Sequence, residues 1–187
     1  MVEAARERFG AVDILVNNAG ATKRGDFLAL TDDDFTDGFA LKFYAAVRAA
    51  QAAWPLLAER QGTIVNVVGA GGRTPGAEFT VGGSVNAALL SLTKALADKG
   101  VADGVQVVAV NPGPVRTGRL EPRVRSLAES QGISTEEAVV RMATGSRVMR
   151  IGEPEDIAAL VAFVASPEGR LLHGALIDID GGLTKTI

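Results

Sequence analysis

The chain has 187 residues, of which 47% are hydrophobic and 22% are charged, and its formal net charge is −3. This composition is typical of one well-buried globular domain and argues against disorder. The acidic balance gives no electrostatic reason to expect a nucleic acid or an anionic membrane as partner. No apolar run reaches the roughly 18 residues of a membrane span. Cysteine is absent and histidine occurs once, which excludes disulfides, thiolate sites and multi-histidine metal sites.

Four short apolar runs predict β-strands. They lie at Val12–Val16, Thr63–Val68, Val105–Val110 and Ala175–Ile179. The first three are rich in Val and Ile without clean alternation, which suits strands that are buried on both faces of a parallel sheet.

Helical patterns fill the segments between these strands. Thr31 is followed by three aspartates, and a hydroxyl cap before acidic residues predicts a helix start. The helix that begins there, or a second one after Gly38, is expected to run to about Glu59, with Pro55 kinking or ending it. Further helices are predicted at Gly82–Lys99, Glu121–Ser130, Ser134–Ala143 and Pro154–Ala165. Strands that alternate with long helices predict an α/β domain with a parallel sheet.

Three of the four predicted strands end in loops that are rich in Asn, Gly and Pro. These loops are Asn17–Gly20, Gly69–Gly72 and Asn111–Pro114. In a parallel α/β sheet, ligands bind beyond the carboxyl ends of the strands, and glycine permits a close backbone approach. We therefore predict a binding site at this edge of the sheet. Tight turns without a binding role are the alternative.

These loops, in this order, resemble those of the short-chain dehydrogenase/reductase family. Residues 13–20 (DILVNNAG) match its strand-plus-NNAG segment, and residues 111–117 (NPGPVRT) match the loop that in the family lies beside the nicotinamide. Residues 150–158 and 178–182 match its closing helix and last strand. The resemblance covers the whole chain and implies a Rossmann-like, doubly wound parallel sheet in a single domain 1–187. Within it, residues 118–152 are expected to form a substrate-side helical segment.

The resemblance also implies a function and a set of contacts. We expect an oxidoreductase that uses NAD or NADP on a small carbonyl or alcohol in the cytoplasm, without a metal. Two long helices around Lys42–Leu57 and Gly82–Lys99 form the dimer interface in the family, so a homodimer or homotetramer is expected. The residues expected to bind the cofactor are Asn17, Ala19, Gly20, Asn86, Pro112, Gly113, Val115 and Thr117.

The chain departs from the family pattern at its front. The family opens with a strand and a Gly-x-x-x-Gly-x-Gly loop that holds the cofactor pyrophosphate, and nothing like this loop occurs here. Residues Val2–Phe9 resemble instead the end of the helix before the NNAG strand. We therefore expect the chain to be a fragment of a longer parent that binds the cofactor, with its N-terminal βα units missing. Val12–Val16 would then present an unpaired apolar edge.

The second departure concerns the chemistry. The family protonates its substrate with a tyrosine, which is acidified by a lysine one helical turn later, while a serine orients the substrate and an asparagine on the preceding long helix completes a proton relay. The corresponding positions hold, in that order, Gly82, Asn86, Gly69 and Lys42. Ordinary Ser-Tyr-Lys catalysis is therefore ruled out.

Two functions stay open. In the first, the protein is an oxidoreductase with non-standard proton transfer. Lys42 then acts as a cationic acid with a pKa lowered by desolvation, and Asn86 still bonds the cofactor ribose. In the second, the protein is a catalytically inactive relative that binds a cofactor or metabolite or only oligomerises. Lys42 would then be a surface or interface lysine.

Other polar residues are weaker candidates. Four of them lie in or beside the loop before the Gly82 helix and are placed to touch a ligand or only water: Arg73, Glu78, Thr80 and Ser84. Tyr44, with Arg48 one turn on, is expected to pack between helices. His173 is expected to have a structural role, and the aspartates Asp178 and Asp180 to bond backbone amides in the closing turn.

Overall fold

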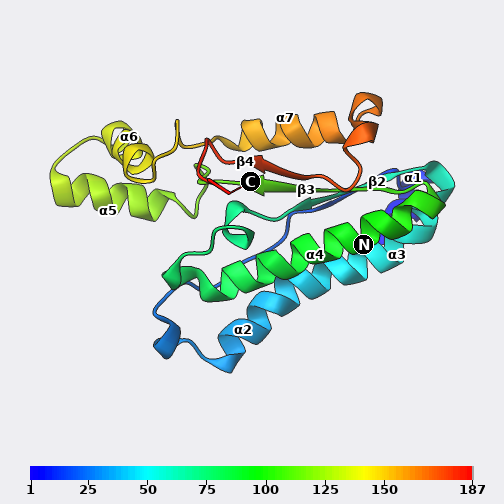
Figure 1. Cartoon of the computed structure of the whole chain (residues 1–187), viewed down its shortest axis with the longest axis horizontal. Helices are drawn as coiled ribbons and strands as arrows, with labels where there is room; N and C mark the ends of the chain where they lie inside the picture. The colour runs from blue at the N-terminus through cyan, green and yellow to red at the C-terminus, as the bar shows by residue number, and fades with distance from the viewer. Residues whose placement is uncertain (187) are drawn as a thin grey trace.

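A computed structural model describes residues 1–186 of the chain. Its four strands form one parallel sheet in the order β1-β2-β3-β4 (Figure 1). The strands are β1 (Ile14–Asn17), β2 (Thr63–Val67), β3 (Gln106–Pro112) and β4 (Leu176–Ile179). The predicted α/β class with a Rossmann-like parallel sheet is confirmed, and each predicted strand lies within two residues of its observed bounds.

Helices cover both faces of the sheet, with α3 and α4 on one side and α7 on the other (Figure 1). The helices are α1 (Val2–Phe9), α2 (Asp32–Gly38), α3 (Ala45–Arg60), α4 (Thr80–Asp103), α5 (Glu121–Gln131), α6 (Thr135–Gly145) and α7 (Pro154–Val164). None of the helices within residues 1–186 is both long and apolar enough to cross a membrane.

The packing of the core explains why apolar and polar residues do not alternate along the strands. Val65, Val108 and Val110 are buried against α7, whereas Ile64 and Val107 are buried against α3 and α4. Because both faces of the central strands are covered, consecutive residues are all apolar.

The long helical region after β1 begins and ends within one residue of the positions that the sequence predicts. The Thr31 hydroxyl accepts the Asp34 N–H at 3.3 Å, and the Asp34 carboxylate accepts the Thr31 N–H at 2.9 Å. The chain then passes through a π-helical turn, Phe39–Tyr44, into α3. Helix α3 continues through Pro55 to Arg60, one residue beyond the expected end at about Glu59, so the alternative in which Pro55 ends the helix is wrong. Pro55 lies on the exposed face, where water can bond the carbonyl that proline leaves without a donor.

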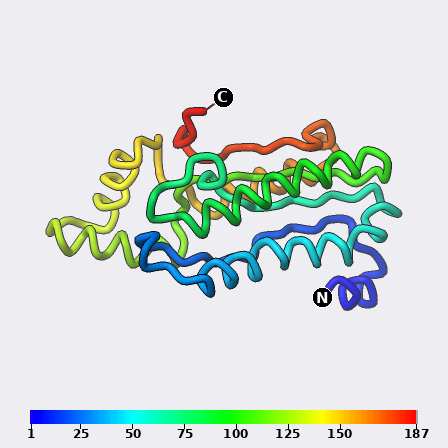
Figure 2. The backbone as a smooth tube through the Cα atoms, turned by 60° about the horizontal axis from the view of Figure 1, so that its bottom comes forward, coloured from blue at the N-terminus to red at the C-terminus, as the bar shows by residue number. Residues whose placement is uncertain are grey.

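Residues 118–152 extend from one end of the sheet, where α5 and α6 pack on each other (Figure 2). They have a hydrophobic cluster of their own, built around Val124, Ala138 and Ile151. This end is the one at which the strands have their carboxyl termini, so the α5–α6 segment stands beside the predicted site.

Strand β1 lies at one edge of the sheet. Among the described residues it pairs with β2 alone. Ile14 and Val16 remain 47% and 42% exposed, which confirms the predicted unpaired apolar edge.

Candidate active site

Lys42 reaches the carboxyl edge of the sheet from the π-helical turn Phe39–Tyr44. Its alkyl chain passes along Gly20, the last residue of the NNAG loop, where an added Cβ would lie 2.9 Å from Lys42 Cδ. Glycine at this position therefore leaves the space through which the lysine side chain runs. Single π-helical turns inside α-helices are frequent at functional sites, and this turn carries Lys42.

The Lys42 ammonium is held by two acceptors. It donates to Asn86 Oδ1 at 2.7 Å and to the carbonyl oxygen of Val68, the residue directly after β2. Burial, and to a smaller extent the positive charge of Arg119, lower the pKa of Lys42 to about 8. Because an ammonium has three N–H groups, one donor remains for a ligand. The residues predicted as a catalytic pair, Lys42 and Asn86, are thus brought into direct contact.

Lys42 and Asn86, which contact each other, occupy two of the positions at which the chain differs from the family pattern. The positions that the family resemblance assigns to an asparagine and a lysine hold Lys42 and Asn86 instead. An ammonium and a carboxamide are therefore both present, with their positions on α4 and on the preceding helix exchanged. Asn86 is 3% exposed, so the pair is shielded from bulk water on the α4 side.

The aromatic ring of Phe79 fills the position of the family tyrosine. Gly82 is buried in the first turn of α4, and a Cβ there would lie 2.0 Å from the Phe79 ring. The same ring lies 2.6 Å from the place of a Cβ on Gly71. At the serine position, Gly69 has a φ of 123° and lies against the Asn86 carboxamide. Phe79 was not among the predicted site residues, and its only sequence signal is an aromatic side chain three positions before Gly82.

The NNAG loop keeps backbone donors available. Asn17 Nδ2 donates to Asn66 Oδ1 at 2.8 Å, and Asn66 Nδ2 donates to Thr93 Oγ1 at 2.9 Å, so this side chain anchors the end of β1 to β2 and α4. The N–H groups of Ala19 and Gly20 donate no backbone hydrogen bond within residues 1–186. Asn17 therefore holds the loop, while the Ala19 and Gly20 N–H groups have no backbone acceptor in the described part of the chain.

The loop after β3 packs closely on the end of β4. The Gly113 N–H donates to the Ile179 carbonyl at 3.1 Å, and a Cβ on Gly113 would lie 2.7 Å from the Cα of Asp180. Only glycine fits this approach without movement of the backbone. Pro112 ends β3 beside Ile179, so both predicted residues belong to the wall that joins β3 to β4.

The rest of this loop is paired with Gly152, just before α7. The Arg116 N–H donates to the Gly152 carbonyl at 2.8 Å, and the Gly152 N–H donates to the Pro114 carbonyl at 2.9 Å. The alternate N–H groups, those of Val115 and Thr117, donate to no acceptor in the described part of the chain. Their donors are thus available at the same edge as those of the NNAG loop.

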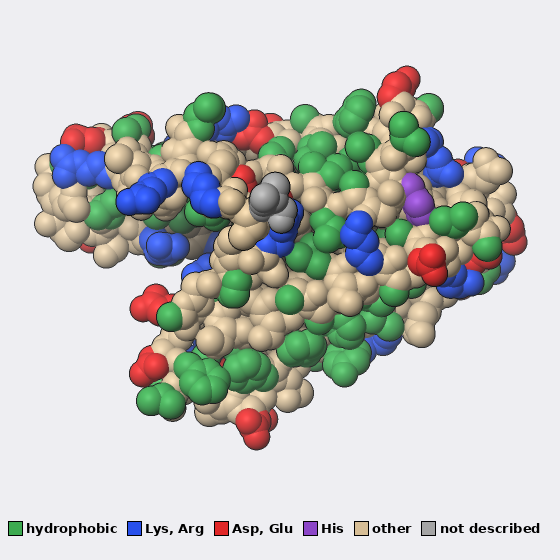
Figure 3. Space-filling view, viewed as in Figure 1, with side chains coloured by type: hydrophobic (Ala, Val, Ile, Leu, Met, Phe, Trp, Pro, Cys, Tyr) green, Lys and Arg blue, Asp and Glu red, His purple; other side chains and the backbone are tan. Residues whose placement is uncertain are grey.

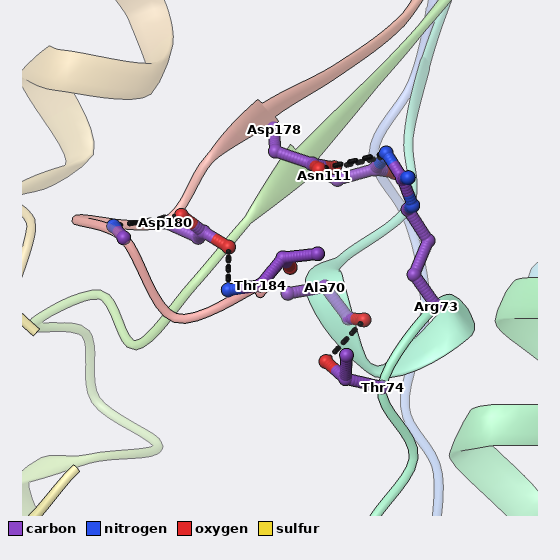
Figure 4. Close-up of polar contacts among 8 residues, drawn as sticks. Ala70, Arg73, Thr74, Asn111, Asp178, Asp180 and Thr184 are labelled. Carbon is purple, nitrogen blue, oxygen red and sulfur yellow. Dashed lines mark hydrogen bonds and ion pairs between the residues drawn. The ribbon is translucent and has the colours of Figure 1, made fainter. Parts of the chain in front are cut away.

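A polar network joins the loop after β2 to β3 and β4 (Figure 4). Asp178 accepts Arg73 Nη1 at 2.8 Å through one oxygen and Asn111 Nδ2 at 2.8 Å through the other. Asp180 accepts the backbone N–H groups of the closing turn at 2.9 and 2.7 Å, as expected. Arg73 is therefore held against β4 rather than extended toward a ligand. Asn111 Oδ1 is buried and has no partner within residues 1–186.

His173 and Tyr44 lie away from this edge. His173 accepts the Val107 N–H at 3.2 Å through Nδ1, and its Nε2 lies 2.7 Å from the Ala97 carbonyl oxygen, so it ties α4 to β3. Tyr44 packs edge-on against Phe43 with ring centroids 5.4 Å apart. His173 thus has the structural role that the sequence suggested, whereas Tyr44 is 50% exposed and contacts its neighbour in the same helical turn.

Comparisons with known proteins agree with this geometry. The profile of a family described as Enoyl-(Acyl carrier protein) reductase matches residues 1–184. The NADPH-dependent reductase BacG of Bacillus subtilis is 32% identical over 179 residues, which are 95% of this chain and 69% of BacG. Oxidoreductase UcpA of Escherichia coli is 35% identical over 188 residues, which are 98% of this chain and 69% of UcpA.

Solved structures give the same answer. L-Sorbose reductase from Gluconobacter frateurii, in complex with NADPH and L-sorbose, superposes with a TM-score of 0.92 and 28% identity over all of this chain and 72% of that protein. An NADPH-bound short chain oxidoreductase from Pseudomonas aeruginosa, described as containing an atypical catalytic center, gives 0.91 and 26% over all of this chain and 71% of that one. The chain belongs to the short-chain dehydrogenase/reductase family.

Proposed function

We propose that the protein is an NAD(P)-dependent oxidoreductase that interconverts a small carbonyl compound and its alcohol, with Lys42 as the proton donor. The observation that carries this proposal is the Lys42 ammonium at the carboxyl edge of the sheet, 2.7 Å from Asn86 Oδ1. The nicotinamide cofactor, when bound, supplies the hydride. A pKa of about 8 keeps Lys42 mostly protonated at neutral pH and makes it a better acid than an ordinary lysine.

The residues at this edge fit the nicotinamide end of such a cofactor. The N–H groups of Ala19, Gly20, Val115 and Thr117, which have no backbone acceptor among the described residues, supply donors for its polar groups in this proposal. The buried Asn111 Oδ1, which has no partner among the described residues, is an acceptor at the same edge. In this proposal Asn86 keeps the Lys42 ammonium in place and bonds the ribose hydroxyls through its amide.

The relatives support both parts of the proposal. BacG is an NADPH-dependent reductase, and the Pseudomonas aeruginosa enzyme binds NADPH while containing an atypical catalytic center. A departure from the usual catalytic residues is therefore compatible with nicotinamide binding in this family. The chain spans 69% of the length of BacG.

The test is turnover of NADPH with a panel of small aldehydes and ketones. Lys42→Met is expected to lower kcat/KM by at least about 100-fold, because general acid catalysis contributes on this scale. NADPH binding, followed by its fluorescence, should change much less. Lys94→Met removes an exposed lysine and is the matched control. Equal turnover by Lys42→Met and Lys94→Met would remove Lys42 from the mechanism.

The pH profile gives a second readout. A general acid must be protonated, so kcat/KM for carbonyl reduction is expected to fall as the pH rises through about 8. This limb should be absent from the residual activity of Lys42→Met. A wild-type profile that stays flat across that range would contradict the role of Lys42.

The second candidate function is a cofactor-binding protein without turnover. Phe79 favours it, because its ring fills the place of the family tyrosine and leaves no hydroxyl at Gly82. NADPH binding of ordinary strength, combined with no turnover of any carbonyl in the panel, would favour this reading over catalysis.

We also propose that the protein is a homodimer or homotetramer that associates through α3 and α4. A groove of about 430 Å³ lies between these helices, with an apolar lining that includes Val47, Trp54, Leu92 and Leu96. Light scattering during size-exclusion chromatography tests the proposal. A charged substitution, Leu96→Glu, should give a monomer, and a wild-type monomer would contradict it.

A further inference from the structure

The carboxamide of Asn86 is fixed in one orientation by Lys42. The Lys42 ammonium has only donors, so the oxygen of the carboxamide faces it, at 2.7 Å. The amide nitrogen of Asn86 then faces the loop after β2. It lies 3.2 Å from the place of a Cβ on Gly69 and 3.8 Å from that of a Cβ on Gly71.

This amide nitrogen is a donor without an acceptor in a side chain that is almost fully buried. Asn86 is only 3% exposed. Its oxygen accepts from Lys42, but its Nδ2 donates to no group in the described part of the chain. Buried polar side chains of native proteins nearly always have hydrogen-bond partners, so this exception points to a ligand or an ordered water.

Gly69 leaves open space in front of the donor. Apart from its two chain neighbours, only Asn86 Nδ2 at 3.2 Å and the Pro112 carbonyl oxygen at 3.9 Å lie within 4 Å of the place of a Cβ on Gly69, among the residues that the structure describes. The φ of 123° at Gly69 disfavours any side chain that would fill this space. Figure 3 shows the molecular surface hollowed between the α5–α6 segment and the region of α2, at the edge where the strands end.

The Lys42 ammonium borders the same space. It donates to the carbonyl oxygen of Val68, the residue directly before Gly69, and keeps one N–H for a ligand. Because Oδ1 and Nδ2 belong to one carboxamide, a ligand atom that accepts from Asn86 Nδ2 also lies close to the ammonium that Oδ1 contacts. One oxygen atom in front of Gly69 can therefore accept from both residues.

We propose that Asn86 is a catalytic residue that binds the carbonyl oxygen of the substrate, together with Lys42, in the space in front of Gly69. This inference rests on the proposed function for the identity of the reaction. As the carbonyl carbon receives the hydride from the reduced nicotinamide, the C=O electron pair moves to the oxygen, which takes a proton from Lys42. Asn86 keeps its protons and donates a hydrogen bond to the developing negative charge. The amide has two N–H groups, so one remains for a ribose hydroxyl.

The probe for this site is N,N-dimethylacetamide, whose carbonyl oxygen accepts hydrogen bonds but is not reduced by a nicotinamide. It is titrated into the isotope-labelled full chain, and the assigned side-chain amide resonances of Asn86 are followed by NMR. These resonances are expected to shift as the probe binds. Those of Asn66, whose Nδ2 already donates to Thr93, should stay in place. The backbone amide resonance of Gly69 gives the dissociation constant in every variant.

Asn86→Asp keeps an oxygen toward Lys42 and loses the N–H groups. It is expected to bind the probe at least about fivefold more weakly, the effect of one hydrogen bond. Its kcat for carbonyl reduction should fall by about 100-fold, the effect of one oxyanion donor. This comparison is made on the low-pH plateau, where Lys42 is protonated in both proteins. Gln131→Glu makes the same chemical change on an exposed side chain of α5 and should match wild type.

Probe binding that leaves the Asn86 resonances unchanged, equal affinity in Asn86→Asp, or no binding at all would overturn the inference, since Nδ2 would then face water only. It would also be overturned if Asn86→Asp weakened NADPH binding and left probe binding unchanged, because the amide would then serve the cofactor alone. Probe binding at Asn86 without turnover of any carbonyl would uphold the donor site and remove only the proposed function. The wild-type titration does not depend on how well the variant folds.

Discussion

Burial of the Lys42 ammonium should leave a measurable trace in the pH dependence of folding. The pKa of this lysine falls from 10.5 to about 8 on folding, and each pKa unit corresponds to about 1.36 kcal/mol. The protonated group therefore costs the folded state about 3 kcal/mol at neutral pH. Because the folded protein binds this proton more weakly than the unfolded chain, the cost disappears as the pH rises from about 8 to 10.5. Between pH 7 and 9.5 this free-energy cost decreases by about 2 kcal/mol.

Lys42→Met isolates this contribution. Methionine keeps most of the side-chain volume and carries no charge. The variant should therefore lack the gain in stability that wild type shows as the pH rises. The free energy of unfolding from urea titrations, followed by circular dichroism and by the fluorescence of the single tryptophan, Trp54, gives the comparison. Relative to wild type, Lys42→Met should lose about 2 kcal/mol between pH 7 and 9.5, whereas Lys94→Met should run parallel to wild type. Parallel curves for Lys42→Met as well would show that the ammonium is not desolvated, and the reasoning would be refuted.

Gly82→Ala should destabilise the protein by about 2 kcal/mol, since its Cβ would meet the Phe79 ring, and Phe79→Ala by a similar amount through lost packing. The double variant should be more stable than the sum of the two by at least about 1 kcal/mol in urea titrations, and strict additivity would refute the contact. Gly113→Ala should cost about 2 kcal/mol because it meets the backbone of Asp180 rather than a movable side chain; an unchanged melting temperature would contradict this. Asp180→Ala should lower the free energy of unfolding by about 2 kcal/mol, because two backbone N–H groups lose their acceptor. Differential scanning calorimetry measures this loss, and an unchanged melting temperature would contradict the prediction.

Much of the fold could be predicted from the sequence because its signals are local. Runs of Val and Ile mark the strands, and the Thr31 cap marks the start of α2. The loops rich in Asn, Gly and Pro all lie at one edge of the sheet, as the parallel arrangement requires. The effect of Pro55 on α3 could not be predicted, because a proline on an exposed helical face can be tolerated and exposure is not a local property.

The site could be predicted only in part. The family pattern placed Lys42 and Asn86 at corresponding positions, but their contact depends on the π-helical turn and on the space at Gly20, neither of which has a clear sequence signal. Arg119 was missed because its partner, Gly20, lies 99 residues away in the sequence and only the fold brings the two together. Phe79 was missed because Gly82 was interpreted only as the loss of the tyrosine side chain. The space that a glycine leaves for a neighbouring side chain was not considered.

The network of Arg73, Asn111 and Asp178 has a consequence for the thermodynamics of binding. It links the loop after β2 to the ends of β3 and β4 through one carboxylate, so these segments are held in a single arrangement before a ligand arrives. A ligand that binds at this edge then loses little free energy to the ordering of loops. Slow amide hydrogen exchange in these loops, in the protein without ligand, would be the corresponding signature.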